Sequence, residues 1–185
     1  MLIVGCTSSA PPLGAARVTP VPETAIAATA GAAFPTSVIS SRAKVFDQQF
    51  IDTLVPHLQL ETELAQIALT RAQHEELRQM AQELIDDDTA LIRDLQEWRE
   101  AWYGSRATPP MGGAAEIANL RSAPEPFDVA FIDALLPLQQ PAIDMANRAV
   151  LEGGQQDLLD AAGGILASHS RYSLQLQAWR KDWAP

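Results

Sequence analysis

Four stretches of the chain carry apolar side chains at alternating intervals of four and three residues. In the first stretch the pattern includes Phe50, Leu54 and Leu64. This spacing aligns the apolar side chains along one stripe of an α-helix, which is typical of helices that pack in bundles. We therefore expect helices over about 43–70 and 74–103, joined by a short turn.

The second half of the chain repeats the first at a constant offset, since Asp128 lies 81 residues after Asp47. Repeat one spans 45–103, a linker spans 104–126, and repeat two spans 127–184. A duplication of this kind indicates two helical hairpins that pack on each other, and it predicts an all-α fold, a four-helix bundle. The tryptophans of the two copies should be buried near the same end of the bundle. Two further matches are Pro56 with Pro137 and Trp98 with Trp179.

Glycine and proline mark the breaks in this pattern. The linker is interrupted by Pro109–Pro110 and Gly112–Gly113, so we expect only a short helix within it, from Glu116 to Arg121. A turn is expected at Gly153–Gly154 between the last two helices. Gly163–Gly164 falls inside the last helix, where glycine is a weak helix former.

The start of the chain differs from the rest in composition. Residues 1–6, MLIVGC, end in a segment that resembles a bacterial lipobox, and we interpret them as the remnant of a lipoprotein signal peptide with lipidation at Cys6. Residues 7–42 are rich in Ala, Pro, Thr and Ser, which predicts a disordered tether for a domain over 43–185. We expect a lipid-anchored protein of the cell envelope, outside the cytoplasm. The alternative is that Cys6 is an ordinary residue in an apolar start.

Composition excludes several classes of protein. The formal net charge of −10 argues against a nucleic-acid surface, which needs clustered Lys and Arg. One cysteine cannot form an intramolecular disulfide or a multi-cysteine zinc or iron–sulfur site. Neither the Glu-x-x-His pairs of di-iron bundles nor a phosphate-binding glycine loop occurs, so we expect no enzyme. The sequence predicts no particular protein partner.

The repeated motif resembles a known family. The pattern FDxxFIDxLxPHxQ starts at Phe46, a helix ending in WxxxWY follows it, and both elements recur after a linker containing MGG. Over about Val45 to Trp183 the chain resembles the bacterial domain-of-unknown-function family 305. The resemblance implies a ferritin-like helical bundle, often secreted or envelope-associated, and some members are linked to copper binding or metal tolerance.

This chain departs from the family pattern at its histidines. The family carries a His-His pair after the proline of each copy, whereas these positions here hold His57–Leu58 and Leu138–Gln139. The chain is therefore similar to a degenerate member that lacks most of the family histidines. His74 matches another histidine that is common in the family, and its position at the hairpin end predicts a solvated surface residue, as for Asp86 and Asp87.

Polar residues interrupt the apolar stripes at four positions that should face the core: His57, Glu61, Asp88 and His169. His57 and Asp88 lie equally far from the first hairpin turn, so they should sit at one height. Asp88 and His169 are equivalent in the repeat, so a pseudo-twofold packing would bring them together near mid-bundle. Two imidazoles with one or two carboxylates suit zinc or copper(II). The alternatives are a metal-free hydrogen-bonded cluster and exposure of these residues to solvent.

Two functions follow from these patterns. The first is an envelope-tethered bundle that binds copper or zinc, or confers tolerance to such a metal, with His57, Glu61, Asp88 and His169 as ligands. The second is a structural or protein-interaction domain that has lost the family metal site and has no cofactor. Convergence of the polar side chains is required by the first function.

Overall fold

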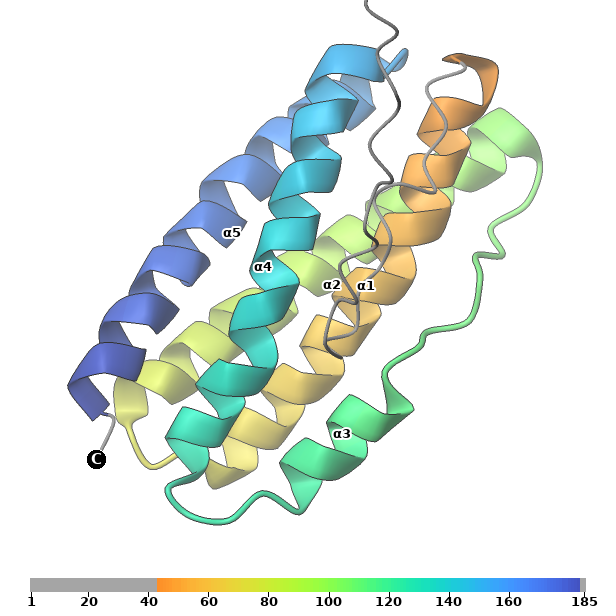
Figure 1. The fold of residues 1–185 in the computed structure, drawn as a ribbon. Coiled ribbons are helices and arrows are strands. Elements are labelled where there is room, and N and C mark those ends of the chain that lie inside the picture. Colours follow the sequence, from red (N-terminus) through yellow and green to blue (C-terminus); the bar gives the residue numbers. More distant parts are fainter. Residues whose placement is uncertain (1–42, 184–185) are drawn as a thin grey trace, which may run out of the picture.

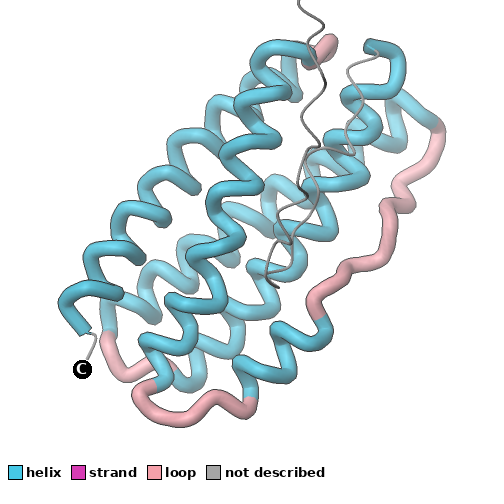
Figure 2. The backbone as a smooth tube through the Cα atoms, viewed as in Figure 1, coloured by secondary structure: helices cyan, strands magenta, loops and turns pink. Residues whose placement is uncertain are grey.

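The structure, a computed structural model, describes residues 43–183 (Figure 1). The predicted lipidation site Cys6 and the predicted tether over 7–42 lie outside the described residues. Over the described range the chain forms helices joined by loops, with no strand (Figure 2). The helices are α1 (Ala43–Arg71), α2 (Glu75–Tyr103), α3 (Ala114–Arg121), α4 (Phe127–Glu152) and α5 (Gln156–Trp183).

The all-α prediction and its hairpin turns are confirmed. Helix α2 ends where Gly104 adopts a left-handed conformation with φ of 75° and donates its N–H to the Glu100 carbonyl, a common way to close a helix. Both long helices that contain internal prolines, α1 and α4, continue through them. Between residues 43 and 183, none of the helices has the length and apolar character needed to cross a bilayer.

Helices α1 and α4 form the centre of the bundle. They pack against each other, while α2 covers α1, α5 covers α4, and the short α3 of the linker lies against α1 and α4. Helices α2 and α5 make little or no close backbone contact with each other. The backbones of α2 and α5 are therefore set farther apart than those of the other neighbouring long helices.

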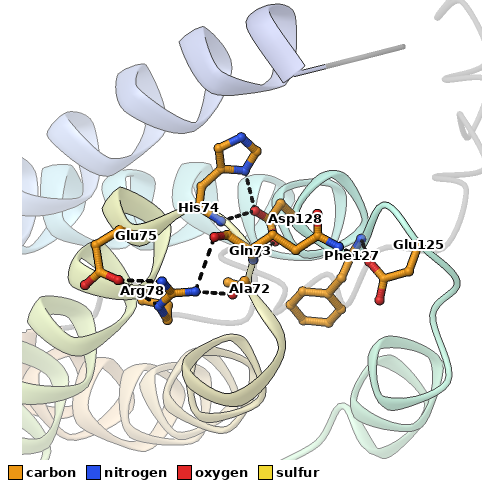
Figure 3. Close-up of polar contacts among 8 residues, drawn as sticks. All are labelled: Ala72, Gln73, His74, Glu75, Arg78, Glu125, Phe127 and Asp128. Atoms are coloured by element: carbon orange, nitrogen blue, oxygen red, sulfur yellow. Dashed lines mark hydrogen bonds and ion pairs between the residues drawn. The ribbon is translucent and has the colours of Figure 1, made fainter.

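The two hairpins are related by a pseudo-twofold arrangement in which each closes the end of the other. Asp128, at the start of α4, accepts hydrogen bonds of 2.8 Å from the backbone N–H groups of Gln73 and His74 at the first hairpin turn (Figure 3). Asp47, the matching residue of α1, accepts one of 3.0 Å from the N–H of Gly154 at the second turn. Both carboxylates therefore bind the turn of the other repeat, through backbone N–H groups that lie just before α2 and α5 begin.

An ion pair inside each hairpin also follows the repeat. Arg99 Nε lies 2.6 Å from Asp52 Oδ1, and Arg180 Nε lies 2.6 Å from Asp133 Oδ1. Both pairs join the first helix of a hairpin to the second. The repeat in the sequence is thus a repeat in the packing.

The prediction that the matching tryptophans lie near the same end of the bundle is wrong. The ring of Trp183, near the end of α5, stacks on His74 at a centroid distance of 3.8 Å, which places the end of α5 beside the first hairpin turn. Helix α2 starts at this turn, and Trp98 lies near its far end. Trp98 and Trp179 therefore lie at opposite ends of the bundle. The reason is that the pseudo-twofold axis runs across the bundle and not along it. Equivalent residues of the two repeats therefore lie at opposite ends. Both side chains are partly buried, and each packs against one of the two apolar clusters of the core.

Candidate functional site

A buried polar layer divides the hydrophobic core in the middle of the bundle. One apolar cluster includes Leu64, Phe131 and Tyr172, and a second cluster includes Phe50 and Leu158. Polar side chains lie between them in sequence on all four long helices. Those of the layer, each at most 3% exposed, are His57, Glu61, Asp88, Gln139 and His169.

The structure brings the four sequence-predicted residues to one place. Ligand-type atoms of Glu61, Asp88 and His169 all lie within 4.8 Å of one another. His57 lies one turn before Glu61 on α1, and its Nε2 is 3.6 Å from Glu61 Oε1. His169 Nδ1 is 3.9 Å from Glu61 Oε2. Their role as metal ligands stays a prediction, but three different helices supply the side chains to one point.

Gln139 of α4 is a member of the layer that the sequence pattern did not single out. Its Nε2 donates a 2.8 Å hydrogen bond to Glu61 Oε1, and its Oε1 lies 3.2 Å from His169 Nδ1. The four-and-three spacing of apolar residues in α4 passes through Leu138, but a bundle helix buries three or four positions in every two turns. A wider stripe includes Gln139, which stands where the family pattern has a histidine.

The layer places acidic side chains close together beside imidazole rings. Burial raises the pKa of the Asp88 carboxyl well above its ordinary value, and the nearby charges of Glu61 and Asp87 raise it further. Burial lowers the pKa of the His169 imidazole, an effect that Glu61 partly opposes and His57 reinforces. His169 is therefore neutral at neutral pH, which is the form that binds metal ions.

Two carboxylate oxygens of the layer are left without hydrogen-bond partners in the part of the chain that the structure describes. They are Glu61 Oε2 and Asp88 Oδ2. A buried carboxylate oxygen with no donor is costly, because it has given up its hydration without replacement. Together with His169, these two carboxylates form a donor set of the kind that zinc and copper(II) accept.

The predicted surface residues have contacts of their own. Asp86 and Asp87 are exposed, and Asp87 accepts a 2.9 Å hydrogen bond from the Tyr172 hydroxyl across the gap to α5. The His74 side chain is 40% exposed, and its Nδ1 pairs with Asp128 at 2.5 Å. His74 is thus part of the closure between the repeats and lies far from the polar layer, at the hairpin end.

The fold and site define a class of protein: a bundle of two duplicated helical hairpins with a buried layer of carboxylates and imidazoles. The chain belongs to the family described as domain of unknown function DUF305, whose sequence profile matches residues 47–180. The family resemblance seen in the repeated motif is confirmed. Among curated proteins, no sequence gives a significant match.

Several solved structures are similar to this chain. CopM in its Cu(I)-bound form is 29% identical, with a TM-score of 0.70 over 75% of this chain and 98% of that chain. CopM in its Cu(II)-bound form is 26% identical, with a TM-score of 0.67 over 75% and 97%. A DUF305 fragment from Deinococcus radiodurans is 18% identical, with a TM-score of 0.66 over 74% and 95%, and shows the fold alone.

Proposed function

We propose that this protein binds one transition-metal ion, zinc or copper(II), in the buried layer formed by His57, Glu61, Asp88 and His169. The observation that carries the proposal is the pair of unpartnered carboxylate oxygens, on Glu61 and Asp88, beside a ring nitrogen of His169. Such a pair is unfavourable without a cation and becomes favourable with one. The proposed role is binding rather than catalysis.

The similarity to CopM supports a metal-related role, because CopM has been solved with Cu(I), Cu(II) and silver bound. The donors in this chain favour a narrower choice of ion. Carboxylate and imidazole ligands suit Zn²⁺ and Cu²⁺, whereas Cu(I) and Ag(I) favour sulfur ligands. We therefore place copper(II) and zinc ahead of the monovalent ions for this chain.

Calorimetric titration of the 185-residue protein with ZnCl₂ and with CuCl₂ tests the proposal. One ion per chain is expected, and His169→Ala should weaken the affinity by at least about 10–100-fold, the loss that follows even the removal of a supporting group at a metal site. His74→Ala is the matched control, since that histidine lies at the hairpin end. Equal affinity in His169→Ala and the control would remove the buried layer as the site.

One observation favours the competing function, a metal-free structural or interaction domain. Gln139 hydrogen-bonds Glu61 and contacts His169, so part of the layer is already satisfied without an ion. In that case burial, which raises the pKa of Asp88, favours the uncharged form of this carboxyl in the core. Absence of zinc and copper binding by the wild-type protein would favour this function.

We further propose that the domain is held at the outer face of a membrane by a lipid on Cys6. The support is the lipobox-like Ile3 to Cys6 and the Ala-, Pro- and Ser-rich segment that follows. Fractionation of cells that express the chromosomal gene provides the test. The wild-type protein should sediment with membranes and Cys6→Ser should be released, whereas equal sedimentation of the two would contradict the anchor.

A further inference from the structure

Two cavities lie between α2 and α5, and they occupy equivalent positions in the two repeats. The first, which we call the open lobe, measures about 480 Å³ and is lined by the second half of α2 and the first half of α5. The second, the bridged lobe, measures about 240 Å³ and is lined by the first half of α2 and the second half of α5. Because their lining positions correspond under the repeat, each lobe is an internal control for the other.

Side chains tie the two helices together across the bridged lobe. Arg171 Nη1 of α5 lies 3.0 Å from Glu83 Oε2 of α2, and its guanidinium also lies over the Tyr172 ring at 4.5 Å. The Tyr172 hydroxyl reaches Asp87 of α2. These contacts span the space between the helices on this side of the polar layer.

The matching positions of the open lobe hold small side chains instead. Ala90 stands where the other lobe has Arg171, and Gly164 stands where it has Glu83. A Cβ atom added to Gly164 would meet no atom within 4 Å, so this glycine is not needed for close packing. Neither Ala90 nor Gly164 has a side chain that can form the ion pair made by Arg171 and Glu83 in the bridged lobe.

The open lobe leads to the polar layer through Asp88. This residue is 3% exposed, lines the lobe and has one carboxylate oxygen without a hydrogen-bond partner among residues 43–183. The other three proposed ligands, His57, Glu61 and His169, are at most 1% exposed. Asp157 and Asp160 of α5 add further negative charge to the lining of the lobe.

We infer that the open lobe is the port through which a divalent transition-metal ion reaches the buried layer, with Asp88 as the first ligand it meets. This inference rests on the proposed metal binding. The carboxylates of the lobe concentrate cations at the mouth, an effect that raises association rates by about 10–1,000-fold at low salt. The bridged lobe lies at the equivalent position in the repeat, but the Arg171–Glu83 ion pair spans it.

The port is tested by building the bridge of one lobe into the other. Ala90→Arg/Gly164→Glu places the Arg–Glu pair of the bridged lobe across the open lobe without changing the net charge. Stopped-flow quenching of tryptophan fluorescence by Cu²⁺ should show association at least about 10-fold slower, within the range that charge and access control. The amount of Cu²⁺ bound at equilibrium should be unchanged. The control is Thr89→Arg/Gly163→Glu, which adds the same side chains at exposed positions outside the lobe.

A second variant separates charge from access. Asp157→Asn/Asp160→Asn should slow association at low salt, and the difference should disappear near 1 M salt, where the screening length falls to about 3 Å. Equal association rates in the bridged variant and its control would overturn the port and leave the metal site standing. Loss of equilibrium binding in the bridged variant alone would mean that the lobe itself holds the ion, which also overturns the port. No Cu²⁺ binding by the wild-type chain, measured by equilibrium titration, would overturn the metal site and the port together.

Discussion

The two repeats agree in the residues that build the bundle and differ in the residues at its centre. Both have an aspartate that binds the turn of the other repeat, an Arg–Asp pair and a stacked tryptophan pair, the last with ring centroids 5.7 Å apart in repeat one and 5.0 Å apart in repeat two. The residues of the two repeats differ at mid-bundle. Repeat one supplies His57, Glu61 and Asp88, whereas the same positions of repeat two hold Leu138, Ala142 and His169.

This difference separates scaffold from site. Pairings that hold the hairpins together occur twice and contribute twice to stability, so divergence there would weaken the whole bundle. Residues near the pseudo-twofold axis all point to one shared centre, and a single set of polar groups is enough to fill it. Repeat two contributes one imidazole and one amide to a layer whose carboxylates both come from repeat one.

The largest expected effect tests the equivalence of the two scaffolds. Phe50 and Phe131 are matched residues, each 0% exposed, in the two apolar clusters. Phe50→Ala and Phe131→Ala should each lower the free energy of unfolding by about 3–5 kcal/mol, because each leaves a cavity in a packed core. Denaturant unfolding measures both. Leu174→Ala, at a side chain that is 69% exposed, is the control and should change stability by less than about 0.5 kcal/mol. Losses that differ by more than about 2 kcal/mol between the two phenylalanines would contradict equivalent packing.

The next effect should be unequal, because the two aspartates that bind the hairpin turns have different numbers of partners. Asp128 accepts from two backbone N–H groups and pairs with the His74 ring, whereas Asp47 accepts from the N–H of Gly154. Asp128→Ala should cost about 2–3 kcal/mol and Asp47→Ala about 1 kcal/mol. His74→Ala measures how much of the Asp128 effect on stability comes from its contact with the His74 ring. Equal losses for the two aspartates would show that the additional contacts of Asp128 contribute nothing.

The sequence predicted the helices and the convergence of the layer for a simple physical reason. Apolar period and hairpin turns define which face of a helix is buried and at what height, so the positions of His57 and Asp88 along the chain were enough to place them together. The heights of the tryptophans could not be predicted in this way. A repeat shows that two units are equivalent but does not give the direction of the axis that relates them, and that direction decides whether Trp98 and Trp179 share an end.

Two features of the site also lie beyond sequence patterns. Gln139 was missed because an amide beside a leucine on a broad stripe has no periodic signature of its own. The opening beside Asp88 depends on what Ala90 and Gly164 do not fill, and this follows only from the spacing of α2 and α5 in three dimensions. The Gly163–Gly164 pair in the sequence indicated a weak helix and gave no sign of a cavity.

A smaller effect probes the layer itself through its pH dependence. The pKa of Asp88 is raised in the folded protein, so the folded state holds a proton that the unfolded state loses above about pH 4. Stability without metal should therefore fall as pH rises from about 4 toward the folded pKa. Asp88→Asn removes this loss, and its stability relative to wild type should increase with pH, by about 1–2 kcal/mol near neutrality.

Urea unfolding at a series of pH values, in the presence of a chelator, measures this difference. His169 titrates in both proteins, and its lowered pKa, which costs stability below about pH 6.5, should largely cancel. Asp86→Asn is the control on the exposed face of the same helix. Parallel curves for wild type and Asp88→Asn would mean that Asp88 titrates normally and is not held in a crowded acidic layer.

The smallest expected effect concerns the two Arg–Asp pairs, which share a 2.6 Å distance but not an environment. The side chains of Arg99 and Asp52 are 11% and 24% exposed, whereas those of Arg180 and Asp133 are 39% and 52% exposed. Arg99 Nη1 also donates a 2.6 Å hydrogen bond to the Ser105 carbonyl, which fixes the start of the linker. Because solvent screens an exposed pair, Arg180→Ala should change stability by less than about 0.5 kcal/mol, while Arg99→Ala should cost about 1–1.5 kcal/mol. Unfolding at low and high salt checks the cause, since screening should affect the exposed pair more. A larger loss for Arg180→Ala than for Arg99→Ala would show that burial does not set the strength of these matched contacts.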